Sequence, residues 1–397
     1  MNSKIDIFSD FFEYLSTDKV SIKELFEEKV KQLGVSQLQV EKALDIERKS
    51  LLPILNNEAK RVDLINLVKI ANFLDISLTE IVKLFASQLP IEFVAELEKA
   101  RKRTYILNNF DIKALKSSIK FFESVNDFDD IEEKILSFFK IKSIYEYENK
   151  IGIAFSKSKR NYSNKMLYFW VKSAHYYLEK INNPYEFDRN ILKDLVSQIR
   201  PYTKNIENGL YIVAKALFKA GVTVIYQPYL PKTQVKGATF IINNKPCIVI
   251  TDLQKNYSTI WFTLLHELYH VLFELDDIGS NVYHLTGESD LFLLDEDAAN
   301  DFAREYLLPT EKAKFIYPFI NDYTIVNQYA SQNNIHPSII YNFYCWDMSR
   351  KGKEYWGYHK QYLHTNYMDI LNKFNSIFDA VGDSEDKIQE QFELLNA

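Results

Sequence analysis

The segment His266-Glu267-Leu268-Tyr269-His270 carries the residue types that a hydrolytic metal site needs. On a helix, residues four apart lie on one face, one turn from each other. Two imidazole nitrogens at this spacing can bind one Zn²⁺ ion, with Glu267 beside the metal as general base. An ordinary packed helix face is the alternative interpretation. The spacing favours zinc hydrolysis, in which Glu267 takes a proton from water and passes it to the departing amine.

A catalytic zinc site also needs a third protein ligand and an open coordination position. Glu296 lies 26 residues after His270, far enough for a loop and a returning helix. Asn300 follows one helical turn later and is expected to accept a hydrogen bond from a zinc-ligating histidine. Asp297 and Glu274 stay open as rival third ligands, because three-ligand geometry alone does not separate neighbours.

The oxyanion formed during peptide hydrolysis would need a further hydrogen-bond donor beside the metal. Three side chains stay open for this role, namely Tyr283, His284 and His336. A single histidine is more often structural than catalytic, and the sequence does not rank the three.

A small sheet and two helices are expected to position these residues, within a chain that is otherwise helical. β-branched runs and turn residues predict the strands, and apolar periodicity predicts the helices. The expected elements are strands over 222–226, 238–242 and 246–251, the last two forming a hairpin, and helices from Ser258 onward and over 295–308.

Composition excludes several other classes of protein. The chain has 397 residues, 47% of them apolar, which is enough for two or three folded domains. It contains only 10 glycines and neither of the common glycine-rich phosphate-binding motifs. Two distant cysteines do not make a disulfide scaffold, and no apolar run is long enough to span a membrane. We expect a cytoplasmic protein with a net charge of -6.

Residues 19 to about 86 predict a compact set of short helices. Ser36 would cap a helix over 37–44, Asp45 forms a tight turn, and a third helix follows over 47–55. This order is typical of a helix-turn-helix, whose third helix enters the major groove of DNA. The candidate DNA contacts are Gln37, Arg48, Lys49, Lys60 and Arg61. Residues 1–86 hold 12 basic against 14 acidic side chains, so a protein-binding or dimerisation role stays open.

The whole pattern resembles the ImmA/IrrE family of bacterial metallopeptidases, in its architecture with an N-terminal Cro/repressor-type (XRE-like) helix-turn-helix. The resemblance is tight from about 210 to 345, and it is looser over the middle region. It implies His266 and His270 as zinc ligands, Glu267 as base and Glu296 as third ligand. The blocks that carry it lie at 221–224, 236–239, 261–270, 299–309 and 335–340.

Two positions depart from the family pattern. Tyr269 stands where the family has a small residue, and residues 340–342 lack the usual Gly-Arg pair. Neither change removes a metal ligand, so they affect the fit of the substrate rather than the metal.

These observations predict a mainly α-helical chain with a small β-sheet. The expected domains are a helix-turn-helix bundle at 1–90, a helical linker at 91–205 and a zincin-like (gluzincin) metallopeptidase domain with a helical C-terminal extension at 206–397. By resemblance, the substrate would be a repressor or antitoxin-like regulator in a stress, mobile-element or phage-defence circuit.

Alternatives stay open at the level of function. One is a DNA-binding transcriptional regulator or antitoxin whose peptidase-like domain acts as a sensor. Self-cleavage between the two parts is another. The expected cofactor is Zn²⁺ and the expected partners are a protein substrate and double-stranded DNA, with a homodimer left open.

Overall fold

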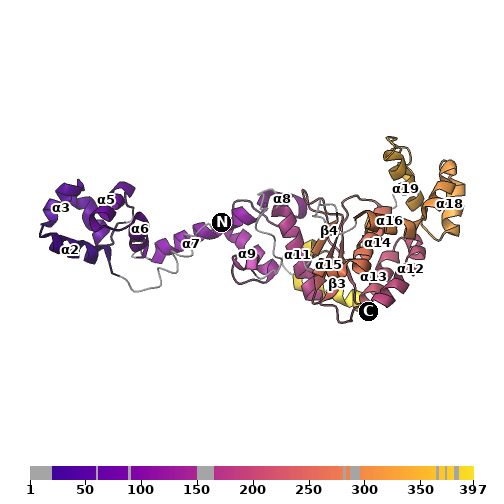
Figure 1. Ribbon diagram of the computed structural model, residues 1–397, viewed down its shortest axis with the longest axis horizontal. Helices are drawn as coiled ribbons and strands as arrows, with labels where there is room; N and C mark the ends of the chain where they lie inside the picture. Colours follow the sequence, from indigo (N-terminus) through magenta and orange to yellow (C-terminus); the bar gives the residue numbers. More distant parts are fainter. Residues whose placement is uncertain are drawn as a thin grey trace. The chain divides into compact units, whose positions relative to one another are not determined.

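A computed structural model describes residues 20–59, 61–87, 91–149, 165–279, 283–286, 296–363, 366–371, 373–379 and 384–397. The chain divides into two compact units, Met1–Tyr105 and Ile106–Ala397 (Figure 1). The division lies within helix α7 (Ile91–Asn109). The three-domain division expected from the sequence stays a prediction.

Short capped helices build the first unit. They are α2 (Ile22–Leu33), α3 (Gln37–Leu44), α4 (Arg48–Leu55), α5 (Leu64–Leu74) and α6 (Leu78–Ser87). Ser21 and Ser36 each form a capping box at the start of their helices, which satisfies backbone N–H groups that have no partner within the helix. Gly34 and Asp45 end α2 and α3 in the left-handed conformation. The predicted third helix begins one residue late, because Glu47 is its N-cap.

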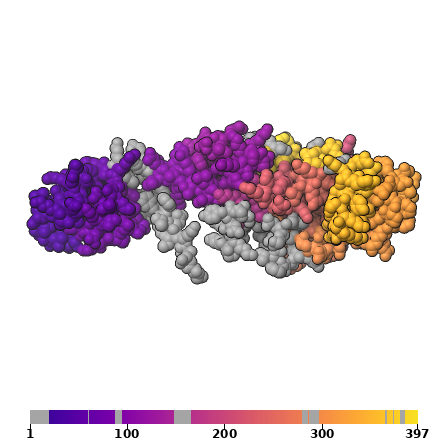
Figure 2. All heavy atoms as spheres, turned by 90° about the horizontal axis from the view of Figure 1, so that it is seen from above, coloured from indigo at the N-terminus to yellow at the C-terminus, as the bar shows by residue number. Residues whose placement is uncertain are grey.

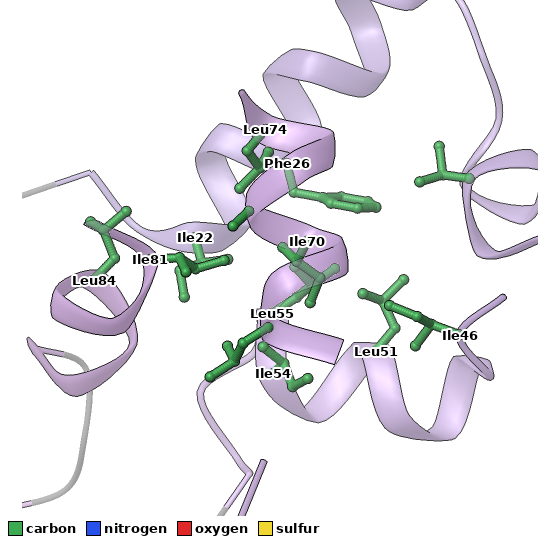
Figure 3. Close-up of a cluster of buried hydrophobic side chains, with 13 residues drawn as sticks. Ile22, Phe26, Ile46, Leu51, Ile54, Leu55, Ile70, Leu74, Ile81 and Leu84 are labelled. Carbon is green, nitrogen blue, oxygen red and sulfur yellow. The ribbon is translucent and has the colours of Figure 1, made fainter. Parts of the chain in front are cut away.

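Apolar side chains from all five helices meet in one core. Figure 3 shows them pointing toward one another. The buried members are Ile22, Phe26, Val40, Ile46, Leu51, Ile54, Leu55, Leu67, Ile70, Ala71, Leu74, Ile81 and Leu84. Burial of this apolar surface is the main force that holds such short helices together.

Most of the second unit is helical as well. Its helices before the sheet are α8 (Ile112–Ile119), α9 (Phe128–Phe139), α10 (Glu146–Asn149), α11 (Lys165–Ile181), α12 (Arg189–Gln198), η3 (Arg200–Lys204) and α13 (Gly209–Lys219). Those from the sheet onward are α14 (Tyr257–Phe273), α15 (Leu275–Gly279), α16 (Glu296–Leu307), α17 (Thr310–Ile316), η4 (Tyr317–Phe319), α18 (Tyr323–Gln332), α19 (Pro337–Ser349), α20 (Lys360–Leu363), α21 (Tyr367–Leu371), η5 (Ile377–Asp379) and α22 (Ser384–Asn396).

A four-stranded sheet lies inside this unit, in the order β1-β3-β2-β4. Its strands are β1 (Thr223–Tyr226), β2 (Gly237–Ile242), β3 (Lys245–Ile250) and β4 (Tyr283–Thr286). β1 runs parallel to β3, and β2 pairs antiparallel with both β3 and β4. Asn243 and Asn244 join β2 to β3 with positive φ angles of 52° and 62°, as a tight hairpin turn requires. The predicted hairpin is present, and β4 is a strand that the sequence did not predict.

Helices pack against the sheet and against one another. Helix α14 packs against β2 and β3, α11 also contacts β2, and α16 packs along α14. Successive residues of β2 and β3 are buried, so both faces of the sheet are covered. The orange segments that follow α16 gather on one part of this unit in the space-filling view (Figure 2).

The expectation of a mainly helical chain with a small sheet and an N-terminal helix-turn-helix is confirmed. Both cysteines are buried as free thiols. Over the described ranges, no helix combines the length and apolar character that crossing a membrane would take.

We predict that the core of the first unit depends on Leu51, whose side chain is fully buried. Leu51→Ala in the full chain should lower the stability of this unit by about 2–5 kcal/mol, because it leaves a cavity among α2–α6. Leu38→Ala is the matched control, since Leu38 is 59% exposed and its truncation should change stability by less than about 0.5 kcal/mol. Hydrogen exchange of the α2–α6 amides measures both, and equal protection in the two variants would contradict the prediction.

Candidate metal centre and nucleic-acid interface

Helix α14 places His266 and His270 on its buried face. The helix begins after Asn256, whose side chain accepts the N–H of Ser258 at 2.9 Å, and it runs to Phe273 without a break. His266 is 1% exposed and His270 is fully buried. Two imidazoles are costly to bury unless their ring nitrogens find partners, so each nitrogen must be accounted for.

Helix α16 brings Glu296 to these imidazoles. The Nε2 atoms of His266 and His270 lie 3.1 Å apart. The carboxylate oxygens of Glu296 lie 3.4 Å from Nε2 of His266 and 3.6 Å from Nε2 of His270. Ligands at tetrahedral zinc distances of about 2.0–2.1 Å are spaced about 3.3 Å from one another. The three side chains therefore have the spacing of three ligands around one small cation.

The hydrogen bonds of the two Nδ1 atoms, which face away from Glu296, set the tautomer of each histidine. Nδ1 of His266 lies 3.2 Å from Oδ1 of Asn300, and Nδ1 of His270 lies 2.5 Å from Oε2 of Glu274. An amide oxygen and a carboxylate oxygen only accept, so each Nδ1 carries the proton. In a neutral imidazole of this tautomer, Nε2 presents a lone pair.

In this tautomer two lone pairs and a carboxylate converge, an arrangement that a cation between them would stabilise. The donor set of two imidazoles and one carboxylate suits zinc, and the hydrogen bonds from Nδ1 are the usual outer contacts of zinc-ligating histidines. The residues present fit a zinc ion. Of the rival ligands, Glu274 lies on the outer nitrogen of His270 and Asp297 is exposed on α16.

The side chain of Glu267 lies against strand β2. Thr239 Oγ1 donates a hydrogen bond to Glu267 Oε2 at 2.7 Å, and Glu267 is fully buried. Gly237 makes room for the carboxylate, because a Cβ atom at this position would lie 2.5 Å from Glu267 Oε1. Strand β2 thus fixes the orientation of the carboxylate that the sequence suggests as the base.

Of the three expected oxyanion donors, His336 is the one whose side chain the structure describes. His336 is the N-cap of α19: its Nδ1 accepts the N–H of Ser338 at 3.2 Å, and its ring packs on Tyr257. Burial lowers the pKa of His336 to about 4, which keeps the imidazole neutral as a cap. These partners belong to α19 and α14 rather than to the histidine pair. Tyr283 and His284 lie in β4, where their side chains fall outside the described part of the structure.

Tyr269, one of the two departures from the resembled family, packs between α14 and α16. Its ring centroid lies 5.6 Å from that of Phe302 on α16 and 4.9 Å from that of Phe273 on α14. The large side chain therefore fills the α14–α16 contact.

Three residues of this site were not predicted in the roles that they have. Glu274 was considered only as a rival ligand, although its position four residues after His270 also fits an orienting partner. Gly237 and Thr239 lie in the 236–239 block of the family resemblance but had no predicted role, because their contact with Glu267 depends on how β2 packs on α14.

The first unit presents a helix-turn-helix made of α3, the turn at Asp45 and α4. Arg48 and Lys49 are exposed in the first turn of α4, the position that enters the major groove in this motif. Gln37 is half-buried and donates to Glu41 at 3.1 Å. Arg61 is exposed beyond α4, and Lys60 lies outside the described residues.

Glu47 and Lys69 contact this helix-turn-helix. Glu47 forms an exposed ion pair with Lys49 at 2.7 Å, and its hydrogen bond raises the pKa of Lys49. Lys69 of α5 donates to the carbonyl oxygen of Asp45 at 2.9 Å and so supports the turn between α3 and α4. The acidic Glu47 competes with any phosphate for Lys49.

The helix order and turn define the first unit as a helix-turn-helix domain. Residues 14–87 match the family model of the Cro/C1-type HTH DNA-binding domain, which confirms that part of the predicted architecture. No curated protein and no solved structure matches the chain. The family match covers the N-terminal part alone, so the ImmA/IrrE resemblance stays a prediction.

We predict that the chain binds one zinc ion through Glu296 and not through its neighbour. Glu296→Gln should weaken zinc binding at least about a hundredfold, since it removes a charged ligand. Glu274→Gln should weaken it about ten- to a hundredfold, because His270 would no longer have its outer carboxylate partner. Asp297→Asn is the control and should leave affinity unchanged. Competition with a chelator measures all three, and weaker binding only in Asp297→Asn would show that the third ligand is wrong.

We predict that Arg48 and Lys49 contact DNA. Arg48→Ala and Lys49→Ala should each weaken binding, and each should reduce the slope of log affinity against log salt by about 1 for every phosphate that the removed side chain neutralises. Lys23→Ala, an exposed position on α2, is the control. Titration of the full chain with DNA from upstream of its own gene measures this. Binding that is unchanged in both variants would rule out these contacts.

Proposed function

We propose that the chain is a zinc-dependent metalloendopeptidase that carries a DNA-binding helix-turn-helix domain and cleaves a regulatory protein. The observation that supports this most strongly is the convergence of His266, His270 and Glu296, with the buried Glu267 next to His266 on the same helix. The resemblance of residues 210–345 to the ImmA/IrrE metallopeptidases agrees with it.

Each residue would have a distinct part in the reaction. His266, His270 and Glu296 would hold the zinc, and Asn300 and Glu274 would fix the orientation of the two imidazoles. When bound, zinc would supply Lewis acidity at this position.

Proton transfer falls to Glu267. Its carboxylate would take a proton from the attacking water and deliver it to the amine of the departing peptide. The hydrogen bond from Thr239 to Oε2 fixes the orientation of this carboxylate. Burial of Glu267 keeps bulk water from competing for that proton.

The helix-turn-helix domain suggests the class of substrate. A peptidase carried on a DNA-binding domain would be concentrated where repressors bind, so we propose a repressor or antitoxin-like regulator as the substrate. The stress, mobile-element or phage-defence setting rests on the family resemblance.

A second candidate is a DNA-binding regulator whose metal domain senses a signal without cleaving protein. The match of residues 14–87 to a DNA-binding family favours this alternative. The two candidates differ in one property: only the peptidase requires the carboxylate of Glu267.

The test uses the full zinc-loaded chain and the regulator encoded next to its gene. We expect cleavage by the natural sequence, and a rate about 10²–10⁴-fold lower for Glu267→Gln at unchanged zinc content, because the general base is removed. Glu311→Gln, on α17, is a control substitution of the same type. Absence of bound zinc, or equal cleavage by Glu267→Gln, would contradict the peptidase; DNA binding with no cleavage of this regulator would favour the sensor.

A further inference from the structure

Three polar residues form a row along one face of α16. Glu296, Asn300 and Arg304 are spaced four residues apart, so they lie above one another on successive turns. The first two meet the histidines of α14. The third, Arg304, lies two turns from the ligand and has no part in the proposed chemistry, although it falls within the 299–309 block that carries the family resemblance.

Arg304 is held by two other elements. Its Nη1 and Nη2 atoms donate to the two carboxylate oxygens of Asp347 on α19, at 2.8 and 2.5 Å. Tyr317 of η4 donates to the same carboxylate at 2.6 Å, and its hydroxyl accepts from Arg304 at 3.3 Å. The side chains of Arg304 and Asp347 are only 13% and 21% exposed. A two-pronged pair of this kind constrains direction as well as distance.

The same guanidinium also contacts an aromatic ring of α19 that packs against α14. It lies 4.9 Å from the ring centroid of Phe343, whose ring is edge-on to Phe262 at 6.3 Å. Phe262 precedes His266 by one helical turn, and their rings lie 6.3 Å apart. Arg304 therefore connects α16 directly to α19, and reaches the helix that carries the histidines through Phe343 and Phe262.

We infer that Arg304, Asp347 and Tyr317 are positioning residues that fix the rotation and axial position of α16, and thereby place Glu296 at the metal. This inference rests on the zinc centre proposed above. Metal-ligand distances tolerate about 0.2 Å, whereas one residue along a helix is about 1.5 Å of rise and 100° of rotation. A ligand in the first turn of a helix needs an anchor farther along it, and Arg304 is that anchor.

A merely structural ion pair would behave differently from a positioning one. Removal of a structural pair lowers the stability of the unit and leaves the geometry of the metal in the folded protein unchanged. Removal of a positioning pair changes zinc affinity and ligand geometry in protein that remains folded. Zinc affinity and the visible spectrum of bound Co²⁺ separate these cases, and neither depends on peptidase activity.

The experiment compares Arg304→Lys and Tyr317→Phe with the natural sequence in the full chain. Lysine keeps the charge but cannot make the two-pronged pair, and phenylalanine lacks only the hydroxyl. The control is Arg350→Lys, the same substitution at the end of α19, where Arg350 contacts the ring of Trp346. Circular dichroism establishes folding, chelator competition gives zinc affinity, and the Co²⁺ spectrum reports ligand geometry.

We expect Arg304→Lys to weaken zinc binding about ten- to a hundredfold and to shift the Co²⁺ spectrum, with Tyr317→Phe changing both in the same direction. Arg350→Lys should match the natural sequence. Unchanged affinity and spectrum in folded Arg304→Lys and Tyr317→Phe would overturn the inference while leaving the zinc centre intact. If Arg304→Lys does not fold, Tyr317→Phe decides alone. Failure of the natural sequence to bind zinc would overturn both the zinc centre and this inference.

Discussion

The second unit of the chain must hold three electron-rich groups close together: the Nε2 atoms of His266 and His270 and the carboxylate of Glu296. In neutral imidazoles with the proton on Nδ1, the two Nε2 lone pairs and the carboxylate do not stabilise one another, so the packing around them must hold them in place. Tyr269 and Phe302 supply that packing between α14 and α16. The outer nitrogens bind Asn300 and Glu274, and this orients the inner nitrogens, Nε2, toward Glu296.

The local parts of this arrangement could be predicted from the sequence. Because His266 and His270 are four residues apart, helical periodicity places them on one face of a helix. The same argument places Glu296 and Asn300 on one face of the next predicted helix. The hairpin between β2 and β3 was marked by its asparagine turn. In each case the signal lies within a few residues along the chain.

The parts that could not be predicted depend on contacts between distant segments. Thr239 and Glu267 are 28 positions apart, and Arg304 and Asp347 are 43 apart. No local pattern encodes such pairs, because they exist only once the sheet and helices have packed. Strand β4 was missed for the same reason: it is four residues long and is defined by its pairing with β2.

In the first unit, the residues that determine the fold differ from those that would determine DNA binding. Capping residues and a buried apolar core specify the five helices, while the exposed side chains that would meet DNA are independent of that core. The ion pair of Glu47 with Lys49 lies on this exposed surface, so the strength of DNA binding can change there while the fold is retained.

The close approach of β2 to α14 has a consequence for how this sequence can evolve. Gly237 leaves space for the side chains of Glu267 and Thr263, because a Cβ atom there would lie 2.5 Å from the carboxylate of Glu267 and 2.6 Å from the methyl group of Thr263. Position 237 is therefore coupled to positions 263 and 267: a larger residue there requires both neighbouring side chains to shift or to become smaller. Among descendants of this chain, replacement of the glycine should therefore be accompanied by changes at its two neighbours.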